Sequence, residues 1–146
     1  MTAEPTEFQR LYTGRLWSVL AWDQLTALWE RIDPAAGWYL VAVGVPPAPT
    51  LASGAADVSA FIERIDALLR AEHRESYCGI VYADDLENPR LIKIYDPNNL
   101  GSSCGYSKNP PLPGWIISRV PPDASVVAGA APGNRRRWWQ GLFRDS

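Results

Sequence analysis

Two apolar runs, SYCGIVYA at 76–83 and RLIKIY at 90–95, decide the fold of this chain. Both are rich in the β-branched and aromatic residues that favour strands. Six mostly polar residues, 84–89, separate the runs, and a connection of this length is too short to form a crossover helix. The two runs are therefore predicted to be neighbouring antiparallel strands.

Two more strands are predicted outside this hairpin. Residues 38–45, WYLVAVGV, form an aromatic and β-branched run that is typical of an interior strand, and two prolines end it. Residues 114–120, GWIISRV, form the last predicted strand, which again stops at two prolines. The apolar residues of 8–22 fit neither the helical nor the strand period, so both structures stay open there.

Apolar periodicity predicts two helices. The clearer one covers 58–72, where apolar residues recur at i, i+3, i+4 and i+7 and make one stripe. The other covers 24–32. An aspartate precedes each helix, and its carboxylate can accept hydrogen bonds from the free N–H groups of the first turn, so Asp57 and Asp23 are the expected N-caps.

These elements predict one α+β domain over residues 1–123. Its antiparallel or mixed sheet has four or five strands, and both helices pack on one face because a sheet and a helix must bury their apolar sides together. A chain of 146 residues has the usual size of a single domain. Small residues at 124–134 predict a flexible linker, which leads to a basic, Trp-rich tail at 135–146.

Composition argues against several classes of protein. The net charge of -2 offers no footprint for nucleic acid, and two cysteines do not make a disulfide scaffold. No apolar run approaches the roughly 20 residues that span a bilayer, and no signal peptide is apparent, so a cytoplasmic location is expected. Charge is uneven: residues 1–134 hold 10 Lys and Arg against 15 Asp and Glu, whereas 135–146 hold four Arg against one Asp.

The loop after the second run concentrates residues from which a ligand site could be built. Successive backbone N–H groups through 99–103 could form a nest for an anion or a polar ligand. A structural turn is the alternative, because Asp, Pro, Asn and Gly are turn formers. No phosphate-loop pattern is present, so a nucleotide site is disfavoured. The candidate ligand-binding residues are Asp96, Asn98, Asn99, Ser102, Ser103 and Trp115.

A thiol-dependent enzyme is an alternative hypothesis centred on Cys104, with His73 as base and Asp96 orienting it. A reactive thiol needs a lowered pKa, usually from a nearby histidine or cation. Cys78 lies in an apolar strand and is expected to be inert. One histidine, two lysines and no nucleophile motif make a thin catalytic inventory, and no spacing predicts a metal or a cofactor.

The tail combines arginines with tryptophans, and these two residue types are over-represented where a few contacts carry most of the binding energy. It could dock on another protein, pack on its own acidic domain or contact an anionic membrane. We expect a non-catalytic accessory or adaptor protein that holds a protein partner through its Trp-rich surface, the loop 96–113 and this tail. A small-ligand-binding module at 96–106 is a further alternative. The candidate partner-binding residues of the tail are Arg135, Arg136, Arg137, Trp138, Trp139, Leu142 and Phe143.

Overall fold

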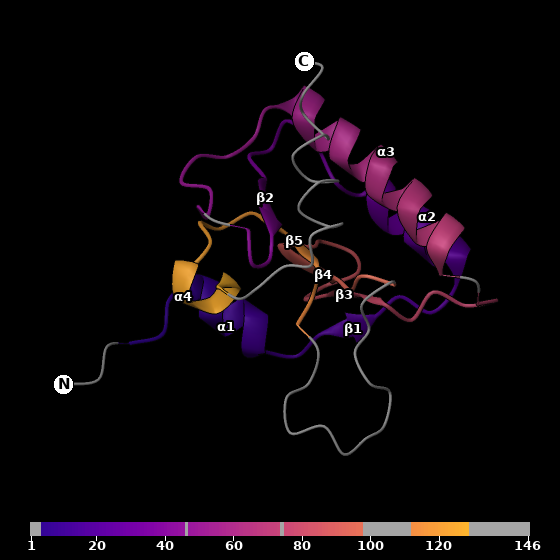
Figure 1. Cartoon of the computed structure of the whole chain (residues 1–146), viewed down its shortest axis with the longest axis horizontal. Coiled ribbons are helices and arrows are strands. Elements are labelled where there is room, and N and C mark those ends of the chain that lie inside the picture. Colours follow the sequence, from indigo (N-terminus) through magenta and orange to yellow (C-terminus); the bar gives the residue numbers. More distant parts are fainter. Residues whose placement is uncertain (1–3, 46, 74, 98–111, 129–146) are drawn as a thin grey trace.

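A computed structural model describes residues 4–45, 47–73, 75–97 and 112–128 of the chain. These residues form a five-stranded antiparallel sheet and four helices, which confirms the α+β class (Figure 1). In chain order the elements are α1 (Glu7–Thr13), β1 (Trp17–Ser18), α2 (Trp22–Glu30), β2 (Tyr39–Ala42), α3 (Ala55–Glu72), β3 (Val81–Ala83), β4 (Leu91–Ile94), β5 (Trp115–Ser118) and α4 (Ala124–Val127).

The strands follow the order β1-β3-β4-β5-β2, and every neighbouring pair is antiparallel. The predicted hairpin is confirmed, with Val81 opposite Ile94. Only the end of the first apolar run is a strand, because Gly79 has a φ of 70°, which side-chain-bearing residues in a regular strand do not adopt. The second of the two runs forms β4, which is the middle strand in the order of the sheet.

The prediction that 38–45 is an interior strand is wrong, since β2 lies at an edge of the sheet in the described part of the chain. The run looks interior because both of its faces are buried. Leu40 and Ala42 belong to the core on one side of the sheet, while Val41 and Val43 belong to the core on the other side. A continuous apolar run indicates that both faces of a strand are buried. It does not indicate that the strand has a hydrogen-bonded neighbour on both edges.

Helices α2 and α3 pack on one face of the sheet, as predicted (Figure 1). Their apolar stripes meet the side chains of alternate residues on the strands, because successive side chains of a strand point to opposite faces. Burying one such large apolar side chain contributes about 1.5–3 kcal/mol. The members of this core include Leu25, Leu28, Val58, Phe61, Ile65, Leu69, Val81, Ala83, Ile92, Ile94, Trp115 and Ile117.

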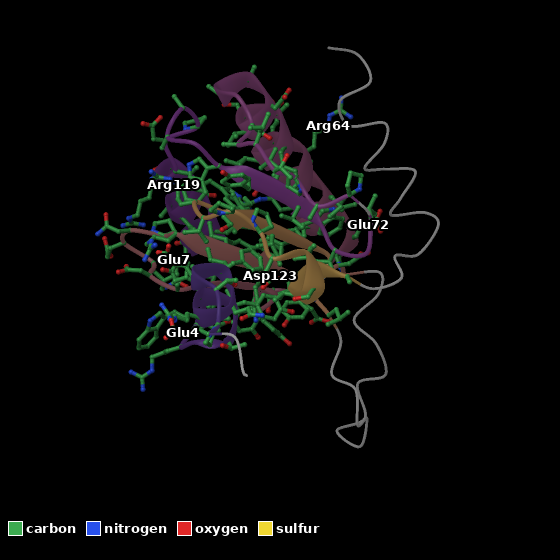
Figure 2. All side chains as sticks on the ribbon, turned by 90° about the vertical axis from the view of Figure 1, so that its left-hand side faces the viewer. Glu4, Glu7, Arg64, Glu72, Arg119 and Asp123 are labelled. Atoms are coloured by element: carbon green, nitrogen blue, oxygen red, sulfur yellow. The ribbon has the colours of Figure 1, made fainter. Side chains whose placement is uncertain are left out.

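The opposite face is covered by α1 and α4, which were not predicted. Figure 2 shows the resulting layers, with Arg64 on the side of α3 and with Glu7 and Asp123 on the side of α1 and α4. Phe8 of α1 is 1% exposed and joins a second core. A hydrogen bond of 3.1 Å from Thr6 Oγ1 to Asp123 Oδ2 links the starts of the two helices. The sheet is thus sandwiched, and the second core contains Phe8, Val41, Val43, Leu91, Ile116, Val120 and Val127.

The interval 8–22, where the sequence left helix and strand open, contains both: α1, then β1, then the start of α2. A capping box begins α1, in which Thr6 Oγ1 accepts from the Gln9 N–H at 3.1 Å and Gln9 Oε1 accepts from the Thr6 N–H at 3.0 Å. Near the C-terminal end of the described residues, α4 occupies the first residues of the predicted linker, and its Val127 is buried. The remainder of that linker and the tail lie outside the described residues.

The predicted N-caps are wrong by two or three residues. The caps are Ala21 for α2 and Gly54 for α3, so Asp23 and Asp57 lie in the first turns instead. Their negative charge still favours the positive end of each helix dipole. Gln24 supplies the missing cap on α2, because its Oε1 accepts from the backbone N–H of Ala21 at 3.0 Å. None of the helices in the described ranges has the length and hydropathy needed to cross a bilayer.

Candidate functional site

His73 lies at the C-terminal cap of α3 and has a structural contact. Its Nε2 is 2.8 Å from the carbonyl oxygen of Cys78, so this nitrogen carries the proton and donates it. Cys78 is fully buried, and burial raises the pKa of its thiol, which matches the expectation of an inert cysteine. Cys104 lies outside the described residues, so a thiol site that joins it to His73 stays a prediction.

Of the predicted ligand-binding residues, the structure describes Asp96 and Trp115. Both lie at one end of the sheet, because Ile94 is opposite Trp115 and Asp96 follows two residues later. Asp96 is buried, and Trp115 is 1% exposed within the core beneath α2 and α3. The indole therefore fills the core. The other predicted residues, in the loop and in the tail, lie outside the described residues.

The structure places a lysine among three tyrosines on the face that α1 covers. Lys93 is the third of the four residues of β4 and is only 8% exposed. Its Nζ lies 3.6 Å from the centre of the Tyr12 ring of α1. Tyr82 of β3 is directly opposite Lys93, and its ring meets that of Tyr95 edge-on with 5.7 Å between centres. We call Tyr12, Tyr82, Lys93 and Tyr95 the Lys–Tyr cluster.

The electrostatics of the Lys–Tyr cluster follow from burial. Desolvation lowers the pKa of Lys93 to about 8, since the charged ammonium loses its water. Burial raises the pKa of Tyr12, and the pKa of Tyr95 is raised by burial and by the neighbouring Tyr12 and Tyr82. In the part of the chain that the structure describes, no carboxylate pairs with Lys93. The sequence signal for this site was a single lysine inside the apolar run RLIKIY.

A second feature is an exposed apolar surface beside β1. Trp17, Leu20 and Tyr77 are 49%, 61% and 55% exposed. They lie on two adjoining segments, which the hydrogen bond from the Cys78 N–H to the Leu20 carbonyl joins at 2.8 Å. We call these three residues the β1 surface.

Packing beneath the β1 surface holds its backbone in place. The ring of His73 meets both Trp22 and Tyr77 edge-on, with centres 6.0 and 6.3 Å apart. The indole N–H of Trp22 donates to the carbonyl of Glu75 at 3.1 Å, and the guanidinium of Arg70 lies over the same indole at 5.3 Å. The exposed side chains therefore project from a supported segment, which lowers the conformational entropy that binding would cost.

An apolar groove of about 430 Å³ lies at the other edge of the sheet, between the segment after β2 and α4. Because β1 and β2 are the two edge strands, this groove and the β1 surface are on opposite sides of the domain. The groove is lined by Gly44, Val45, Pro47, Ala48, Pro49, Thr50, Pro122, Ala124, Val127 and Ala128.

The carboxylates between β3 and β4 hold the hairpin together. Asp84 Oδ1 accepts from the backbone N–H groups of Arg90 and Leu91 at 2.7 and 2.9 Å. Asp85 Oδ1 accepts from those of Asn88 and Glu87, and these bonds lower the pKa of Asp85. No group of three metal-ligating side chains occurs among the residues described. The two aspartates thus act as turn formers.

We expect Asp84→Ala to lower the free energy of unfolding by about 1–2 kcal/mol, because two backbone N–H groups lose their acceptor. Urea denaturation of the purified chain measures this change. Asp84→Asn retains one acceptor oxygen in the same place, so its loss should be smaller. Equal losses for the two variants would contradict the assigned hydrogen bonds.

Comparison of the chain with protein-family models, with curated proteins and with solved structures found no match.

Proposed function

We propose that the protein is a non-catalytic accessory protein that holds a protein partner, and that the β1 surface is its contact site. The observation that carries this proposal is the exposure of Trp17, Leu20 and Tyr77 on adjoining, supported segments. Large aromatic side chains on a fixed backbone are the anchors that dominate binding energy at protein interfaces. A cytoplasmic location remains part of this proposal.

The distribution of exposed side chains favours the β1 surface over other places. Five large apolar residues in the described part of the chain are exposed, and three of them form the β1 surface. The other two, Leu51 and Leu112, lie on separate segments. Single exposed leucines are normal on any protein, whereas a group of aromatic and aliphatic side chains marks an interaction site.

Charge indicates which partner would fit. The described residues contain 8 Lys and Arg against 15 Asp and Glu. This negative domain attracts a basic protein and speeds its encounter, while the apolar contact at the β1 surface stabilises the complex. We propose a partner that meets the β1 surface with an apolar patch on a basic surface. The basic tail residues 135–146 are a proposed second contact, with an acidic part of the same partner.

Affinity purification with the full-length chain as bait would identify the partner, and the purified pair then tests the site. The double variant Trp17→Ser/Leu20→Ser should weaken the binary complex at least tenfold, because it removes two of the three apolar side chains that would contact the partner. A tenfold loss of affinity corresponds to about 1.4 kcal/mol of binding free energy. Leu51→Ser is the matched control: it removes an 81% exposed leucine away from the β1 surface and should leave the affinity within twofold. Unchanged affinity of the double variant would overturn the proposed site.

Deletion of residues 129–146 tests the tail separately. A fall in affinity that adds to the effect of the double variant would support two contacts. An affinity equal to that of the full chain would show that the tail is not part of this interface.

A further inference from the structure

We propose that the Lys–Tyr cluster is a binding site for a carboxylate. Lys93 supplies the positive charge, and the hydroxyl groups of Tyr12, Tyr82 and Tyr95 are the available donors around it. The site is distinct from the β1 surface and does not depend on the proposed partner.

Lys93 carries a charge that nothing described on the protein neutralises. More than nine-tenths of this residue is buried, and lysine is almost never buried to this extent without a partner of opposite charge. The contact with the face of Tyr12 supports the cation only partly. An anion bound beside Nζ would supply the missing charge and form a charge-assisted hydrogen bond.

The described groups nearest Lys93 are compatible with a bound anion. The ring of Tyr12 on α1 contacts Lys93, Tyr82 is opposite it on β3, and Tyr95, which follows β4, meets the ring of Tyr82. The position opposite Lys93 on β5 is Ile116, which carries no charge. The facing ionisable groups are therefore phenols, which are neutral hydrogen-bond donors at physiological pH. Among the residues that the structure describes, no acid that would repel a bound carboxylate is opposite Lys93 in the register of the sheet.

The number of charges and the shape of the site select the class of anion. One lysine balances the single charge of a carboxylate, but leaves up to about half of the charge of a phosphate (about −1.5 to −2 at pH 7) uncompensated. All three tyrosines are partly exposed. These rings give an apolar or aromatic body a surface to contact, and benzoate is a suitable probe.

Isothermal titration of the full-length chain with benzoate at pH 7 tests this site. Wild-type protein should bind, and Lys93→Met should lose at least tenfold in affinity because the charged partner is gone. Arg64→Met is the matched control, since it removes a cation from α3 on the other side of the sheet (Figure 2) and should bind within twofold of wild type. No heat of binding to wild type, or equal affinity of Lys93→Met, would overturn the proposal.

Four further measurements sharpen the result. Affinity should fall as the pH rises above about 8, where Lys93 loses its proton. Tyr95→Phe should bind a few-fold more weakly than wild type if its hydroxyl donates to the anion. Inorganic phosphate should bind more weakly than benzoate, and tighter binding of phosphate would overturn the carboxylate assignment. Comparing benzoate with a peptide that has blocked termini and one glutamate distinguishes two sources of the carboxylate, a free small molecule and a protein side chain.

Discussion

Replacing Phe8 by alanine is expected to lower the free energy of unfolding by about 3–5 kcal/mol. Phe8 is 1% exposed, and its ring lies in the second core together with Leu91 of β4 and Ile116 of β5. Alanine would leave a cavity under α1 that the neighbouring strands cannot fill without moving. Urea denaturation followed by tryptophan fluorescence measures the change.

This prediction tests whether α1 is an integral layer of the domain. If residues 7–13 were a frayed arm, Phe8→Ala would change stability by less than about 0.5 kcal/mol, as surface substitutions do. Leu20→Ala is a suitable control, since this leucine is 61% exposed and should show only such a small change. Equal small effects of the two variants would contradict the packing of α1 on the sheet.

Replacing Lys93 by methionine is expected to stabilise the protein by about 1–3 kcal/mol at pH 7. A shift of the Lys93 pKa from 10.5 to about 8 corresponds to roughly 3 kcal/mol of penalty for the buried charge. The contact with Tyr12 and the partial opening to solvent reduce this figure. Methionine has a similar shape and no charge, so it fills the same space without the penalty.

The gain should depend on pH in a direction that the pKa determines. The folded-state pKa of Lys93 lies below that of the unfolded chain, so the folded protein binds fewer protons between about pH 8 and 10.5. The penalty is complete below pH 8 and disappears as the pH rises through this window. The difference in stability between Lys93→Met and wild type should therefore be largest at pH 6–7 and vanish near pH 10.5.

Arg64→Met provides the control for this measurement, because Arg64 is exposed on α3 and its removal should change stability by less than about 0.5 kcal/mol. A loss of stability in Lys93→Met at pH 7, or a gain that does not change with pH, would contradict an uncompensated charge. An uncompensated buried charge lowers the stability of the fold. Residues that lower stability in this way are commonly found at binding sites.

The central hairpin and the two long helices could be predicted from local sequence. In 76–83 and 90–95 the strand-forming residues, the short polar connection and the apolar pattern all favour one structure, and β3 pairs with β4 accordingly. Helix α3 is long enough for its apolar stripe to repeat several times, so its periodicity is unambiguous. Helix α1 has only seven residues, and its period cannot be distinguished from the apolar stretch around it.

The candidate sites depended on contacts that sequence spacing does not encode. Lys93 was a polar residue in an apolar strand, and Tyr12 lies 81 positions before it in the chain. In the β1 surface, Leu20 and Tyr77 lie on segments that a hydrogen bond from the Cys78 N–H to the Leu20 carbonyl joins. Neither grouping follows from a motif, because each brings together segments that are far apart in the chain.

The sequence by itself determined the α+β class, the hairpin and the faces of the long helices, because these depend on interactions within one element or between adjacent ones. Only the tertiary structure decided that the sheet is covered on both faces, that β2 is an edge strand and that Lys93 lies buried beside Tyr12. The physical reason is that burial depends on how the whole chain packs. Helix α1 shields Lys93 from water, and the sequence of β4 contains no pattern that predicts this contact.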